Sequence, residues 1–172
     1  MNKTMKEFPK RKTTRAINFD YNSAGAYFLT ICTQNRRCLL AHVVGTGVLD
    51  GPTVELTEYG RIAEKYLKQL NDFYNNIFVE RYVIMPNHIH LLLRVLAEDG
   101  PSGTPVPTVQ NSVVSRFIST FRRFCNREYG ENIWQYRSFD HIIRDREDYE
   151  VREKYIAENP IRWYYDELYS DE

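Results

Sequence analysis

Long apolar runs are missing from this sequence, and so is any apolar stretch directly behind its basic beginning. A membrane-spanning helix needs roughly 18 consecutive apolar residues, so we expect none. A secretory signal needs an apolar segment where this chain has Glu7-Phe8-Pro9-Lys10, so we expect none of these either. Cysteine is scarce, with three residues and no CxxC pair, which excludes a disulfide scaffold and fits a reducing compartment. The expectation is a cytoplasmic protein without a membrane partner.

Neither sign of charge is in excess. Lysine and arginine together number 23, aspartate and glutamate together number 23, and the formal net charge is zero. Net charge therefore does not indicate a nucleic-acid partner, although the local distribution of charge still can. The apolar fraction of 42% and the length of 172 residues are typical of one globular domain with its own core. Aromatic residues are plentiful, and 13 of them are tyrosines.

Hydrophobic periodicity and turn signals predict alternating strands and helices. Strands are expected at 26–33, 38–44 (returning as a hairpin partner of the first), 54–56, 77–85 and 88–96, with a further extended segment at 134–144. Helices are expected from the N-cap Thr57 to Asn71, over about 109–127, and over 147–159, where Asn159-Pro160 ends the helix. This order predicts an α+β fold, a ferredoxin-like sandwich in which helices pack on an antiparallel sheet.

The sharpest local feature is His88-Ile89-His90 on a predicted strand. Because side chains alternate along a strand, both imidazoles project to the same side, and the apolar other side must be covered by helices. Two imidazoles this close are natural ligands for one divalent cation. The alternative is a pair of hydrogen-bonded or exposed histidines without a metal, and only a third ligand separates the two interpretations.

The last predicted helix offers such a ligand. Tyr155 and Asn159 are four residues apart and are therefore neighbours on one helical face. Asn159 supplies a carbonyl oxygen that Mg²⁺ or Mn²⁺ accepts, and Tyr155 supplies a hydroxyl that can act as a covalent nucleophile once activated. Both residues have ordinary structural uses as well, since asparagine before proline is common at helix ends and tyrosine is abundant here.

Basic residues gather in two places along the chain. The N-terminal arm is one, and it can contact phosphates or remain a solvated terminus. The other is a stripe on the predicted helix 109–127, which can follow a phosphate backbone or simply form a solvated face. The residues concerned are Lys10, Arg11, Lys12 and Arg15 in the arm, and Arg116, Arg123 and Arg127 in the stripe.

Three segments, spread over about residues 11–163, together resemble a known family. They are YFLTICT (27–33) followed by Arg36-Arg37; VIMPNHIHLL (83–92); and Trp134-Gln135 leading through DHIIR (140–144) to YIAENP (155–160). In this order and spacing they are similar to the single-tyrosine HUH transposases, named for two histidines around a hydrophobic residue. Within that group they resemble the REP-associated tyrosine transposases.

The resemblance implies a ferredoxin-like fold with His88 and His90 on a central strand, where with Asn159 they would ligate a divalent metal, Mg²⁺ or Mn²⁺. It implies that Tyr155 attacks a phosphodiester of single-stranded DNA and leaves a 5′-phosphotyrosine link and a free 3′-OH. The substrate would be an imperfect palindrome folded as a hairpin. Arg36 and Arg37 join the arm and the stripe as expected DNA contacts.

On this interpretation we divide the chain into a basic arm (1–16), a catalytic domain (17–165) and an acidic tail (166–172) that should stay off DNA. The partner is single-stranded or hairpin DNA, and the protein is a monomer or a homodimer. One alternative is a domesticated DNA-hairpin binder without catalysis, which the intact Tyr155 and its proposed ligands argue against. Another is a metal hydrolase that activates water, which would need more carboxylates near the histidines than the apolar run after His90 supplies.

Overall fold

The computed structural model describes residues 23–45, 51–97 and 112–170. Four strands form one antiparallel sheet in the order β4-β5-β1-β6, and two shorter strands form a separate pair. The strands are β1 (Gly25–Cys32), β2 (Ala41–Val44), β3 (Thr53–Leu56), β4 (Ile77–Ile84), β5 (His88–Val95) and β6 (Phe139–Ile143). The helices are α1 (Glu58–Phe73), α2 (Val113–Tyr129) and α3 (Arg146–Arg162).

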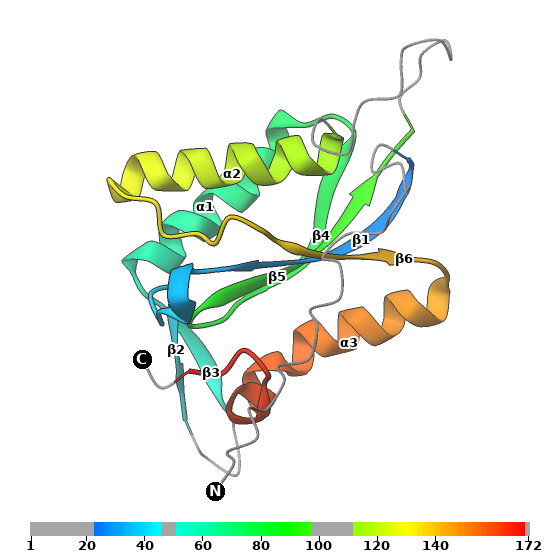
Figure 1. Cartoon of the computed structure of the whole chain (residues 1–172). Helices are drawn as coiled ribbons and strands as arrows, with labels where there is room; N and C mark the ends of the chain where they lie inside the picture. Colours follow the sequence, from blue (N-terminus) through cyan, green and yellow to red (C-terminus); the bar gives the residue numbers. More distant parts are fainter. Residues whose placement is uncertain (1–22, 46–50, 98–111, 171–172) are drawn as a thin grey trace, which may run out of the picture.

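Helices α1 and α2 lie together on one face of the sheet, and α3 lies on the opposite face (Figure 1). This is a split βαβ arrangement in which β5 is inserted between β1 and β4. The predicted α+β, ferredoxin-like class is confirmed, with the two histidines on an inner strand. Among the described residues, no helix has the length and apolarity needed to cross a membrane.

Strand alternation divides the side chains of β1 and β5 between the two faces of the sheet. One set packs with the apolar stripes of α1 and α2 in the main core, as the sequence pattern predicts. The members of this set are Tyr27, Leu29, Ile31, Ile89, Leu91, Leu93 and Val95. The other set faces α3, and there the register aligns Phe28 with Leu92, Thr30 with His90 and Cys32 with His88.

The start of α1 is fixed by local chemistry that the sequence predicts. Thr57 caps the helix, because its hydroxyl oxygen accepts a hydrogen bond from the backbone N–H of Gly60 at 3.2 Å. Glycine is required three residues after the cap, since a Cβ at position 60 would overlap the backbone carbonyl oxygen of Leu40. The segment before β2 therefore packs directly on the first turn of α1.

Two details of the predicted elements are wrong. The segment 38–44 does not pair with the first strand, because both edges of β1 are already hydrogen-bonded, to β5 and to β6. The chain instead turns away at Asn35 and Arg36, which have φ of 55° and 57°, and β2 pairs with β3.

The last helix does not end at Asn159-Pro160 but continues through Pro160 to Arg162. A proline this close to the end of a helix removes only one late hydrogen bond. The N–H of Trp163 closes the helix on the carbonyl of Pro160. Residues 109–111 of the predicted second helix lie outside the described residues. Helix α2 begins after Ser112, whose hydroxyl oxygen accepts a hydrogen bond from the N–H of Ser115, and it ends at Gly130.

Candidate metal and nucleophile site

Two buried imidazoles form the centre of the site. His88 and His90 project from the same face of β5, are 0% and 3% exposed, and have ring centroids 4.4 Å apart. The Nδ1 atom of His88 lies 2.8 Å from Asn87 Oδ1, and Nδ1 of His90 lies 2.8 Å from Thr30 Oγ1. With Nδ1–H donating to these oxygens, each Nε2 keeps its lone pair, which is the arrangement that orients histidine ligands for a metal.

The protonation state of the pair agrees with that arrangement. Burial lowers the pKa of His88 to about 4 and holds the pKa of His90 well below its ordinary value. Both rings are therefore neutral at pH 7. Neither Nε2 atom has a hydrogen-bond partner among the described residues. Buried polar atoms are rarely left without partners, so two adjacent ones on the same side of the strand are suited to bind a cation together.

Helix α3 adds a third atom of the same kind. Asn159 is 1% exposed, and its side-chain oxygen Oδ1 likewise lacks a partner among the described residues. Its amide nitrogen is used, because Nδ2 donates to Asp166 Oδ2 at 3.1 Å. The structure thus brings the three predicted ligands together from β5 and α3 and leaves one lone-pair atom available on each.

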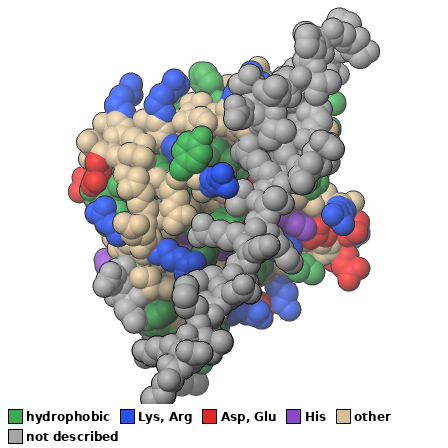
Figure 2. Space-filling model, viewed as in Figure 1, with side chains coloured by type: hydrophobic (Ala, Val, Ile, Leu, Met, Phe, Trp, Pro, Cys, Tyr) green, Lys and Arg blue, Asp and Glu red, His purple; other side chains and the backbone are tan. Residues whose placement is uncertain are grey.

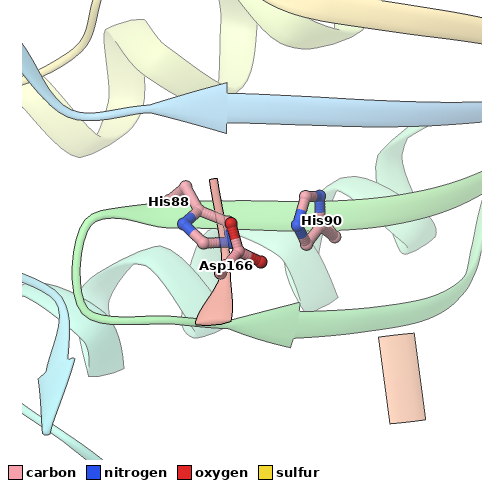
Figure 3. A group of neighbouring side chains, drawn as sticks. All are labelled: His88, His90 and Asp166. Carbon is pink, nitrogen blue, oxygen red and sulfur yellow. The ribbon is translucent and has the colours of Figure 1, made fainter. Parts of the chain in front are cut away.

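A carboxylate that sequence reasoning missed completes the cluster. Single ligand atoms of His88, His90 and Asp166 all lie within 4.8 Å of one another, and Figure 3 shows Asp166 beside both imidazoles. Asp166 was assigned to the acidic tail, and nothing in its local sequence distinguishes it from the other acidic residues there. Its place depends on α3 running past Pro160, after which the short 3-10 helix Trp163–Tyr165 leads the chain back to the site.

Tyr155 lies against the same cluster. Its ring centroid is 5.1 Å from that of His90 and 5.9 Å from that of Phe28, and its hydroxyl donates to Asp166 Oδ2 at 3.1 Å. Burial, followed by the negative charge of Asp166, raises the pKa of Tyr155 to about 12. The hydroxyl is therefore a neutral phenol at pH 7, and a nearby cation is needed to make it an effective nucleophile.

These residues fit a divalent cation. Two neutral imidazole nitrogens, an amide oxygen and a carboxylate are donors that Mn²⁺ and Mg²⁺ accept. Cys32, which faces His88 across the sheet, is an unsuitable ligand because burial raises the pKa of its thiol to about 11.

The predicted DNA-contacting arginines separate into two groups. Arg36 and Arg37 are exposed, and Arg36 lies at the edge of the site: Asn87 Nδ2 donates to its carbonyl at 3.2 Å, and its guanidinium donates to the Glu167 carbonyl at 2.9 Å. The stripe on α2 is exposed too, but α2 covers the face of the sheet opposite to the histidines (Figure 1). The four arm residues, Lys10, Arg11, Lys12 and Arg15, lie outside the described residues.

On the described part of the face seen in Figure 2, lysine and arginine side chains are spread out and do not gather in one patch. This distribution agrees with the zero net charge of the chain.

The antiparallel α+β fold has a counterpart among solved transposase structures. The chain is 20% identical to a solved REP-associated tyrosine transposase bound to a REP hairpin, with a TM-score of 0.57 over 92% of this chain and 74% of the other. At that level of identity, the likeness is one of fold.

Three sequence relatives show which proteins the chain is similar to beyond its fold. The chain is 29% identical to an uncharacterised Haemophilus influenzae protein over 94% of both chains, and 29% identical to a putative REP-associated tyrosine transposase of that organism over 88% of this chain and 79% of the relative. It is 24% identical to the REP-associated tyrosine transposase of Escherichia coli, over 83% and 70%. No protein-family model matches the chain. These relatives confirm the resemblance: the chain is a homologue of the REP-associated tyrosine transposases.

Proposed function

We propose that this chain is a metal-dependent single-stranded DNA endonuclease and strand transferase that acts on hairpin-forming palindromic repeats. The observation that carries the proposal is the set of buried atoms without partners, His88 Nε2, His90 Nε2 and Asn159 Oδ1, next to the ring of Tyr155. A purely structural cluster would satisfy these atoms. The substrate class follows from the homology, because one such transposase is described bound to a REP hairpin.

Four residues would hold the cation, Mg²⁺ or Mn²⁺: the two histidines through Nε2, Asn159 through Oδ1 and Asp166 through its carboxylate. A bound cation would polarise the phosphate and offset the negative charge that develops on it during the reaction. Thr30 and Asn87 keep the imidazoles in the required orientation.

In the chemical step, the hydroxyl oxygen of Tyr155 attacks the phosphorus of a DNA phosphodiester. The new bond joins that oxygen to phosphorus, and the bond from phosphorus to the 3′ oxygen breaks. The proton of Tyr155 passes along its existing hydrogen bond to Asp166 Oδ2, and the departing 3′ oxygen takes a proton from water to become a 3′-OH. Because the 5′-phosphotyrosine keeps a phosphodiester, the reverse attack rejoins DNA without ATP.

One chain supplies all of these groups. Tyr155 contacts His90 of its own chain, which supports a site that functions in a monomer. Arg36 and Arg37 are proposed to contact DNA as it enters the site, and the N-terminal arm is proposed to contact it nearby. The α2 arginines are proposed to contact a more distant part of a hairpin, since they lie on the opposite face of the sheet.

The test is covalent capture on a denaturing gel. Labelled single-stranded oligonucleotides carrying the palindromic repeats that flank the gene are incubated with the protein and Mn²⁺. We expect an adduct that disappears with chelator, in His88→Ala and in Tyr155→Phe. The matched control is Tyr149→Phe, because Tyr149 is on the same helix but its hydroxyl binds Glu80 at 2.9 Å. An adduct that persists in Tyr155→Phe would contradict the assignment of the nucleophile.

Asp166 gives specific support to a second candidate. It supplies the carboxylate beside the histidines that a water-activating phosphodiesterase would need. In that case DNA would be cut without any adduct, and cutting would survive Tyr155→Phe. Hairpin binding with neither cutting nor adduct would instead indicate a domesticated DNA-binding protein.

A further inference from the structure

Arg152 is a cation of the site that neither the sequence pattern nor the proposed ligand set includes. It precedes Tyr155 by three residues and Asn159 by seven on α3, so the three side chains share one helical face. Its guanidinium carbon lies 5.3 Å from the ring centroid of Phe28. The same ring is 5.1 Å from that of His90, stacked, and 5.9 Å from that of Tyr155. Phe28 is therefore a shared platform for the arginine, a proposed ligand and the proposed nucleophile.

Asp148, the acidic neighbour of Arg152, makes its hydrogen bonds to other groups. Arg152 Nε forms an ion pair with Asp148 Oδ1 at 3.5 Å, but this nitrogen is buried and has no hydrogen-bond partner among the described residues. The Asp148 carboxylate is instead bound to His141 Nε2, at 2.7 and 2.9 Å, and to the N–H of Arg144.

Other arginines of α3 are paired more closely. Arg146 and Arg162 contact Glu150 and Glu158 at 2.6 and 2.7 Å and have 92% and 61% of their side chains exposed. Arg152 is only 32% exposed. A half-buried guanidinium whose Nε donor is unused requires an explanation, because burying a polar group without a hydrogen bond costs stability.

The contacts of the Phe28 ring place this charge beside His90 and Tyr155, where the proposed reaction takes place. The carboxylate of Asp166 lies at the site as well. An entering phosphodiester adds a further negative charge, and attack on phosphorus increases it.

We propose that Arg152 is a catalytic residue whose guanidinium binds the non-bridging oxygens of the scissile phosphodiester. The inference rests on the proposed function and adds to it a named phosphate ligand from the protein itself. Arginine suits this role because its planar fork of N–H donors matches two phosphate oxygens, and the cation–π contact with Phe28 favours a position of the guanidinium beside the site.

The test is a double-mutant cycle. It asks whether the effect of removing the charge of Arg152 depends on the charge of the scissile phosphate. The scissile linkage is first mapped from the adduct that the unaltered protein forms. Binding of that oligonucleotide is then measured in a Tyr155→Phe background, with either a normal linkage or an uncharged methylphosphonate at the scissile position. Both oligonucleotides are tested with three proteins: Tyr155→Phe alone, Tyr155→Phe with Arg152→Gln, and Tyr155→Phe with Arg146→Gln. Arg146→Gln is the control, because it removes the same charge from the same helix far from the site.

With the normal linkage, we expect Arg152→Gln to weaken binding about tenfold or more and Arg146→Gln to change it little. With the methylphosphonate oligonucleotide, the protein that carries both Arg152→Gln and Tyr155→Phe should bind as tightly as Tyr155→Phe alone. In the otherwise unaltered protein, Arg152→Gln should slow adduct formation roughly 10²-fold or more, and Arg152→Lys should recover part of that rate. Mn²⁺ affinity, measured by calorimetry, should stay within about twofold in Arg152→Gln, which shows an intact site.

Equal losses with both linkages would make Arg152 a structural residue and overturn the inference, and so would an unchanged rate of adduct formation. Lost Mn²⁺ binding in Arg152→Gln would overturn it as well, because the side chain would then support the metal site instead of the phosphate. Failure of the proposed function looks different: the unaltered protein itself would form no adduct on any repeat oligonucleotide.

Discussion

Thr30 and His90 face each other across β1 and β5, and the threonine hydroxyl oxygen lies 2.8 Å from Nδ1 of the histidine. This contact fixes the ring and leaves Nε2 directed to the proposed cation. Thr30→Val keeps the shape and removes the hydrogen bond. We expect it to weaken Mn²⁺ binding about 10- to 100-fold in calorimetry. Thr30→Ser should bind normally, and equal affinity in Thr30→Val would show that the contact has no role in metal binding.

A metal that binds only the folded site should stabilise the protein. With free Mn²⁺ at 100 times its dissociation constant, the free energy of unfolding should rise by about 2.7 kcal/mol, and Tm by roughly 5–10 °C. His88→Ala should abolish this rise. His42→Ala is the matched control, because His42 is exposed on β2 and should leave the rise intact. A rise of Tm that survives in His88→Ala would place the metal elsewhere.

Gly60 should be intolerant of alanine although it lies inside a helix. Alanine normally favours a helix interior over glycine by about 1 kcal/mol. Here the added Cβ would meet the carbonyl oxygen of Leu40, a backbone atom that cannot rotate away. Gly60→Ala should therefore lower the free energy of unfolding by about 1–3 kcal/mol, measured by urea denaturation. Gln69→Ala, at an exposed position of α1, should cause little change, and a stabilised Gly60→Ala would contradict the close packing.

The cysteines should differ in reactivity. Burial raises the pKa of Cys32 to about 11 and that of Cys125 to about 12, so few thiolates form at pH 8. Cys38 is half-buried near the surface. A thiol reagent such as DTNB at pH 8 should label Cys38 first, with the other two reacting only after unfolding, as peptide mapping would report. Rapid labelling of Cys32 in the folded protein would show that its face of the sheet is open.

The fold follows largely from local sequence signals. The alternation in β1 and β5, the Thr57 cap and the apolar stripes of α1 and α2 each act within a few residues, and each was predicted. The pairing of β2 with β3 was not, because it is decided by which edges of the sheet are free. The end of α3 was misplaced because the preference of a residue before proline is weaker than the packing around it.

The candidate site divides in the same way. His88 and His90 are two residues apart on one strand, and Tyr155 and Asn159 are four apart on one helix, so each pair could be read from spacing. That the two pairs meet is a tertiary fact, and it was expected only from the family resemblance. Asp166 and Arg152 stand among other charged residues in the sequence, and nothing local distinguishes them. Only the folded path of the chain brings them to the site.

The central claim is that one particular tyrosine among 13 becomes covalently joined to DNA. The most direct measurement is mass spectrometry of the adduct formed with Mn²⁺, after nuclease and protease digestion, to find which tyrosine carries the 5′-phosphate. The account predicts a single modified peptide in which the nucleotide is attached to Tyr155. A nucleotide on any other residue, or cut DNA with no modified peptide, would contradict it.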